Sequence, residues 1–204
     1  MPLAAAIAEV AEQIVLSGLY GRQVGTHRSA EWPLMWHCFG EPYLGAAHGH
    51  IGILAMLLHA KALGALKPQA TPYIDATLDA LLATQRAHGN VPTVLSGHSG
   101  CSCAGGAADD GLVHWCHGAP GFVSLLAVAA SDSSISEERR HELVEAAIEA
   151  GRTVWARGVL KKGTGLCHGV AGNAYALLTL HRLTSDVVWL QRARAFGSML
   201  GSPE

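Results

Sequence analysis

Three copies of one short motif, His-Gly-x-x-Gly, limit what this 204-residue chain can fold into more than any other feature. The copies begin at His48, His117 and His168, and each runs directly into an apolar stretch. Such internal similarity indicates a repeat architecture in which each copy is one supersecondary unit. Two glycines at a helix start permit close backbone approach and leave the first helical N–H groups unpaired. Three converging starts would form a cavity, although a single copy would equally well shape a tight loop-to-helix turn.

Helical periodicity dominates the rest of the chain and period-two alternation is scarce, so the sequence predicts an all-α fold. Very apolar helices alternate with more charged ones, as an inner and an outer ring of helical hairpins requires. Gly18 is expected to end the first helix, Thr71 with Pro72 to begin the third, and Ser136 to cap the fifth. The predicted helices span residues 3–17, 51–63, 71–87, 121–130, 137–157, 172–183 and 186–200, and a Gly- and Ser-rich loop spans 91–113.

Composition excludes several classes of protein. Half of the residues are hydrophobic and 15% are charged, which argues against intrinsic disorder. The net charge of −2 comes without a basic block, so no nucleic-acid partner is expected. Glu9 and Glu12 stand in the N-terminal segment, and His59 and Lys61 interrupt the longest apolar stretch. We therefore expect no transmembrane segment and no export signal, and we interpret residues 1–204 as a single domain.

The cysteines indicate a reducing compartment. Their number is odd, so they cannot all pair with one another, which argues against a framework of disulfides. The sequence therefore favours a cytoplasmic protein, with peripheral association with the plasma membrane left open. The five positions are Cys38, Cys101, Cys103, Cys116 and Cys167.

Two loop sequences carry a family resemblance. Residues 115–121 (WCHGAPG) and 165–173 (GLCHGVAGN) resemble the signature loops of the lanthionine synthetase C-like (LanC-like) proteins of eukaryotic type. The match extends to residues 113–115, 161–163, 47–49 and 88–90, in the same order. The resemblance implies an α/α toroid, a double ring of seven helical hairpins. This chain matches only the later middle part, so we expect the N-terminal hairpins and the final hairpin to be missing, and the chain to self-associate and be inactive alone.

The resemblance also implies that Cys116, Cys167 and His168 are the protein ligands of a catalytic zinc ion. The chemistry of these residue types agrees, because two thiolates and one imidazole leave a fourth tetrahedral position open. Cys167 and His168 are neighbours that a loop, rather than a regular helix, allows to reach one metal. Taken singly, each cysteine could instead be a small buried hydrophobic residue.

An open zinc position would make a thiol nucleophilic at neutral pH. By the resemblance, the thiol is glutathione, and it adds to dehydroalanine or dehydrobutyrine in a peptide or protein to form a thioether. His48 is the candidate general acid for the resulting enolate, or else a capping histidine. Lys162 could attract a glutathione carboxylate or stabilise the enolate, or be a solvated lysine. Trp115 is expected to line the cavity beside the metal, and His117 to be structural rather than a ligand.

Three alternatives remain open. The same scaffold could be a non-catalytic adaptor that binds glutathione and zinc. A glycosidase-like α/α barrel would need two inward carboxylates, but Asp109 and Asp110 fall in the Gly- and Ser-rich loop. His98 with Cys101 and Cys103 could bind a second metal, although a flexible insertion is the favoured interpretation of that segment.

Overall fold

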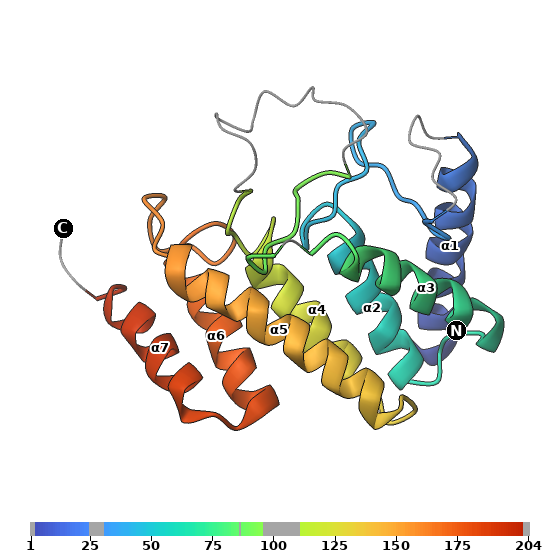
Figure 1. Cartoon of the computed structure of the whole chain (residues 1–204). Coiled ribbons are helices and arrows are strands. Elements are labelled where there is room, and N and C mark those ends of the chain that lie inside the picture. The colour runs from blue at the N-terminus through green and yellow to red at the C-terminus, as the bar shows by residue number, and fades with distance from the viewer. Residues whose placement is uncertain (1–2, 25–30, 86, 96–110, 202–204) are drawn as a thin grey trace.

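The chain folds into a helical structure, seen here in a computed structural model that describes residues 3–24, 31–85, 87–95 and 111–201 (Figure 1). Within those ranges there are no β-strands beyond two isolated bridges, so the all-α prediction is confirmed. The seven α-helices are α1 (Leu3–Val24), α2 (His50–Ala62), α3 (Thr71–Leu82), α4 (Ala119–Ala130), α5 (Glu137–Arg157), α6 (Val170–Thr184) and α7 (Val187–Ser198), and a short 3₁₀-helix, η1 (Pro68–Ala70), precedes α3.

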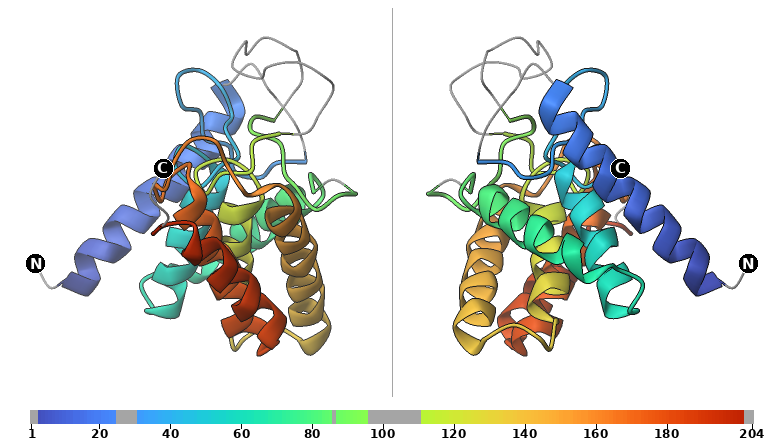
Figure 2. Two further views of the ribbon diagram at one scale, coloured as in Figure 1. Left: turned by 90° about the vertical axis from the view of Figure 1, so that its left-hand side faces the viewer. Right: turned by 90° about the vertical axis from the view of Figure 1, so that its right-hand side faces the viewer.

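The helices form two layers. Helices α2, α4 and α6 pack side by side in one row, and α3, α5 and α7 each pack against the preceding member of that row (Figures 1 and 2). Helix α4 lies in the middle and contacts α2, α5 and α6. This placement explains why α4 is apolar all round, with Phe122, Leu125 and Leu126 fully buried. The layers match the predicted alternation, but the described helices do not close a ring, and the toroid stays a prediction.

Helix α1 is seven residues longer than predicted because Gly18 does not end it. Gly18 is buried beneath the Trp36 indole, and Gly21 faces the carbonyl of Met35. The Met35 N–H donates to the Gly18 oxygen over 3.0 Å, and the Trp36 indole N–H donates to the Ile14 oxygen, also over 3.0 Å. Both glycines therefore allow a crossing segment to approach the helix, and neither stops it.

Helix α1 is also the one helix within the described residues that is long and apolar enough to cross a membrane by length and composition. Core helices and signal sequences pass the same test. Ala11 and Val15 are buried on one side of α1, which packs against α2, whereas Leu3 and Tyr20 are exposed.

Helix α3 ends at Leu82, five residues before the predicted end. Beyond Leu82 the backbone leaves the helical path. The Gln85 side-chain amide there donates to the Gly89 oxygen over 3.0 Å and to the Ala146 oxygen of α5 over 2.8 Å. This link between two helices outweighs the local helix preference of the sequence.

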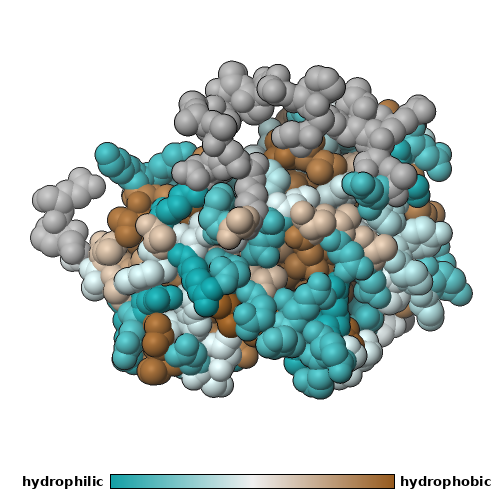
Figure 3. Space-filling model, in the orientation of Figure 1, coloured by the Kyte–Doolittle hydropathy of each residue, from teal (hydrophilic) through white to brown (hydrophobic). Residues whose placement is uncertain are grey.

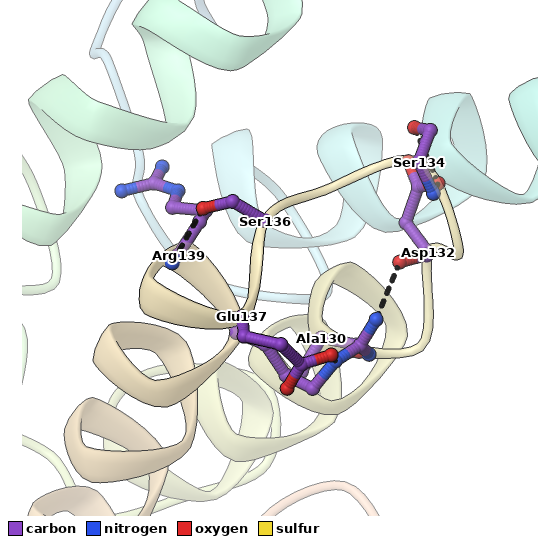
Figure 4. A network of polar contacts seen from close by, with 7 residues as sticks. Ala130, Asp132, Ser134, Ser136, Glu137 and Arg139 are labelled. Carbon is purple, nitrogen blue, oxygen red and sulfur yellow. Dashed lines mark hydrogen bonds and ion pairs between the residues drawn. The ribbon is translucent and has the colours of Figure 1, made fainter.

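The α4–α5 turn closes the end of the molecule opposite the motif-bearing loops (Figure 1), and Figure 4 shows its polar contacts. The Ser136 hydroxyl caps α5 by accepting from the Arg139 N–H over 3.2 Å, as predicted. The Asp132 carboxylate accepts from the N–H and hydroxyl of Ser134 over 2.8 and 2.7 Å. The Arg140 guanidinium donates to the Asp132 carbonyl oxygen over 3.1 Å and to the end of α4. The hairpin is thus fixed by polar groups at the end far from the motif-bearing loops.

Candidate metal centre

The loops that precede α2, α4 and α6 meet at one end of the molecule, at the top of Figure 1. The Cys116 N–H donates to the Cys167 carbonyl oxygen over 3.1 Å, and the Ala47 N–H reaches the Cys116 carbonyl oxygen over 3.4 Å. The loop that carries Cys116 is therefore held between the other two. The predicted convergence of the three motif copies is observed.

The glycines of the motif have one structural role in all three copies. A side chain at the second glycine would collide with the carbonyl oxygen of the residue six positions earlier. A side chain at the first glycine would likewise collide with the carbonyl oxygen of the residue six positions before that glycine. The repeat thus encodes a loop that folds back tightly on the start of its own helix. The second-glycine pairs are Gly52 with Ala46, Gly121 with Trp115, and Gly172 with Leu166.

The first helical N–H groups at these starts are paired, which corrects the expectation that they face the cavity unpaired. The His50 N–H donates to the Tyr43 oxygen and the Val170 N–H to the Gly163 oxygen, both over 3.1 Å. In the second copy the Asn90 side chain takes this role. Its carbonyl accepts from the Ala119 N–H over 2.7 Å, while its amide donates to the Leu112 oxygen over 3.3 Å.

Cys116, Cys167 and His168 form a group that could hold a metal ion, because one ligand atom from each lies within 4.8 Å of the others. Ligands of a tetrahedral zinc ion lie about 3.8 Å apart, so small side-chain rotations suffice to close the group on an ion. Cys116 is buried, whereas Cys167 and His168 are exposed. The donor set therefore fits zinc, with one side of the group open to solvent.

The surroundings of the Cys116 thiol disfavour its ionisation. Burial is the main cause that raises the pKa of the Cys116 thiol to about 11, and the hydrogen bond and charge of Cys167 contribute to that rise. A bound metal ion would instead favour the thiolate form of Cys116. Burial also lowers the pKa of the nearby His114 to about 4, with the charge of Lys162 adding to the effect. Lys162 is thus close enough to act on the site electrostatically.

The other residues predicted for the site lie on the same face. His48 is exposed, and its ring centroid is 5.6 Å from that of His117. Trp115 is 38% exposed, and its β-carbon would touch a side chain at Gly172. Lys162 is exposed on the loop before α6. His117 is not part of the metal-binding group.

Sequence reasoning missed two residues that shape the site. The Tyr43 ring lies 5.6 Å from the His117 ring and 6.4 Å from the His48 ring. Asn90 stands out in the sequence only as part of a motif, because its bridging role depends on a partner loop distant in sequence. Cys38 lies in a separate tight turn with Glu41. His98, Cys101, Cys103, Asp109 and Asp110 lie outside the described residues.

Two hollows of about 680 and 280 Å³ lie away from this group. The larger lies between α3 and α5, and the smaller is lined by residues of α2, α3, α4, α5 and the α4–α5 turn. Neither includes a residue of the metal-binding group.

These features define an all-helical protein of repeated hairpins, within the described residues, with a Cys-Cys-His group in the loops that precede α4 and α6. The chain belongs to the lanthionine synthetase C-like protein family, whose match covers residues 4–202, so the predicted resemblance is confirmed. It is 40% identical to LanC-like protein GCL1 of Arabidopsis thaliana over 92% of this chain and 39% of that protein. It is 38% identical to glutathione S-transferase LANCL1 of Danio rerio over 80% of this chain and 36% of that protein. The chain thus spans less than half the length of both relatives.

Proposed function

We propose that this protein joins a thiol, glutathione, to dehydroalanine or dehydrobutyrine in peptides or proteins, using zinc held by Cys116, Cys167 and His168. The observation that carries the proposal is the close grouping of these three side chains, open on one side. Family membership supports it, as does the relative named glutathione S-transferase LANCL1.

Zinc bound by this group would lower the pKa of a thiol that enters its open position, so that the thiolate is present at neutral pH. The protein residues supply the rest of the chemistry. The thiolate sulfur forms a bond with the β-carbon of the dehydroamino acid, and the π-electron pair moves onto the adjacent carbonyl as an enolate. His48 donates a proton to the α-carbon, which restores the carbonyl. The thiol proton lost at the start balances the proton gained at the end.

Charge supports an anionic thiol such as glutathione. Residues 42–74, 111–131 and 150–185, which include the three loops and the inner helices, contain no Asp or Glu, whereas Lys161 and Lys162 stand just before Cys167. We assign Lys162 to a glutathione carboxylate or to the enolate oxygen. Trp115 would shield the reacting atoms from water beside Cys116. A reducing, cytoplasmic location would keep both cysteines available as ligands.

Zinc content and turnover of matched cysteine variants test this proposal. The wild-type chain should bind about one zinc ion, and Cys116→Ala and Cys167→Ala should each lose it, because each removes a ligand. In a longer chain that spans the full length of the relatives, the same two substitutions should also abolish thioether formation. Cys38→Ala is the control and should keep the ion. Mass spectrometry of the metal and a glutathione-addition assay with a dehydroalanine peptide give the two results. Equal zinc content in all four proteins would overturn the ligand assignment, and zinc with glutathione binding but no turnover would indicate the adaptor.

A further inference from the structure

The end of the molecule where the loops before α2, α4 and α6 meet, here called the loop face, carries a tight turn. This turn holds an aromatic residue in an unfavourable backbone conformation. Cys38 and Glu41 exchange two backbone hydrogen bonds of 2.9 and 3.1 Å, and the two residues between them, Phe39 and Gly40, have φ values of +52° and +83°. Two positive φ values mark a type I′ hairpin turn, which prefers Asn, Asp or Gly at its first position. A bulky residue there is an outlier.

The Phe39 side chain is also 92% exposed, so packing within the described chain does not explain why a phenylalanine occupies this strained position. Exposed apolar side chains are common, and Figure 3 shows scattered apolar patches between hydrophilic ones on this view of the surface. Exposure alone would therefore not single out Phe39. The combination with a left-handed backbone does, because strain of this kind persists mainly where function requires the side chain.

The turn is joined to the candidate site through Tyr43, four residues after Phe39. Behind it, the Leu95 N–H donates to the Pro42 oxygen over 3.0 Å and the Leu44 N–H to the Thr93 oxygen over 2.9 Å. The Tyr43 ring between these two bonds faces His48 and His117. Four residues of extended chain span at most about 14 Å, so Phe39 lies within that distance of Tyr43 along the backbone.

Apolar side chains also flank the metal-binding group directly. Trp115 precedes Cys116 and is 38% exposed, and Leu166 precedes Cys167 and is 60% exposed. A peptide whose reacting residue sits at this group would place its neighbouring residues over Trp115 and Leu166. Four residues of an extended peptide, at roughly 3.4 Å per residue, span about 14 Å, which matches the upper limit of the separation between Phe39 and Tyr43.

We propose that Phe39 binds an apolar side chain of the peptide substrate about three to five residues from the dehydroamino acid, and so determines which peptides are modified. The inference rests on the proposed function, whose substrate it specifies. Phe39 acts in binding and takes no part in the chemical step.

The test uses Phe39→Asn, which removes the aromatic ring and installs the residue that the turn prefers. Phe39→Tyr keeps an aromatic ring at the same position. Leu63→Asn removes a 69% exposed side chain at the other end of α2 and serves as the surface control. The probes are fluorescein-labelled peptides with alanine at the reacting position, which cannot react, and with or without one leucine about four residues away.

Binding is measured by fluorescence anisotropy on the zinc-loaded chain. Wild type, Phe39→Tyr and Leu63→Asn should bind the leucine peptide about 3- to 10-fold more tightly than the polar peptide, as partial burial of one leucine would give. Phe39→Asn should lose this preference while its melting temperature stays equal or rises by about 1–4 °C. A structural role would instead lower the melting temperature.

Three results would overturn the proposal: no leucine preference in the wild type, an unchanged preference in Phe39→Asn, or a lower melting temperature of that variant. If Phe39→Asn lost binding to phosphatidylserine vesicles but kept the leucine preference, the occupant would be a lipid surface and the peptide proposal would be wrong. Glutathione addition to N-acetyl-dehydroalanine methylamide, which is too short to reach Phe39, tests the proposed function separately, in a longer chain that spans the full length of the relatives. If that reaction were absent but the leucine preference still depended on Phe39, the proposed glutathione addition would be wrong, whereas the contact between Phe39 and the peptide would be supported.

Discussion

His48 is the residue on which the chemical step depends most directly in our proposal. It is exposed on the loop face, with its ring 5.6 Å from that of His117, and it is not a member of the metal-binding group. His48→Gln should therefore keep its zinc and lose about 10²-fold in the rate of glutathione addition, the scale of a lost general acid.

Metal analysis of that variant gives the zinc content, and single-turnover kinetics of the same substitution in a longer chain that spans the full length of the relatives give the rate. His59→Gln, near the far end of α2, should change neither of them. If His48→Gln lost its zinc, His48 would have to be reassigned as a ligand or as a support for the loop.

The loop-to-helix unit is the element that positions the cysteines. In the third copy, Gly172 lies in the first turn of α6, where a methyl group would meet the Leu166 carbonyl oxygen and the Trp115 side chain. The Leu166 carbonyl belongs to the peptide group that leads into Cys167. Gly172→Ala should thus push this loop away from the Cys116 loop, destabilise the fold by about 1–3 kcal/mol and reduce zinc binding.

Gly197 provides a matched control because it lies inside α7, where an added methyl group would meet nothing within 4 Å beyond the backbone of its own helix. Gly197→Ala should stabilise the chain by up to about 1 kcal/mol, as alanine favours a helix over glycine. Urea unfolding with parallel zinc analysis measures both variants. Equal effects of the two substitutions would show that the close approach of Gly172 to the Leu166 carbonyl oxygen determines neither stability nor zinc binding.

At the scale of the whole molecule, a buried histidine makes stability depend on pH. His50 is fully buried between Trp32 and Trp36, with its Nδ1 2.8 Å from the Tyr43 oxygen. Burial lowers the pKa of His50 from 6.5 to about 4. The unfolded chain therefore binds this proton first as the pH falls, and the folded state loses up to roughly 3 kcal/mol between pH 6.5 and pH 4.

Urea unfolding at several pH values from 7 to 4 tests this expectation by its slope. The free energy of unfolding of the wild type should fall across that range and level off below it. His50→Gln should unfold more easily at pH 7 but show a shallower fall, because the glutamine cannot take up the proton. Identical slopes for the two proteins would show that His50 does not carry the effect.

The sequence by itself determined the local features of this protein. Hydrophobic periodicity predicted seven helices and their two layers, and the family resemblance carried by two cysteine-containing motifs implied that Cys116, Cys167 and His168 come together. The helix predictions succeeded because periodicity, caps such as Ser136 and loop-to-helix glycines act within a few residues of chain.

Only the tertiary structure decided the features that depend on distant partners. Gly18 continues α1 because Trp36 packs over it, and α3 ends early because Gln85 binds α5. Asn90 completes the second loop, and Tyr43 joins the site, only once separate segments meet. Such contacts join residues far apart in the chain, and their free energies exceed the local preferences of any one segment, so no pattern along a single sequence records them.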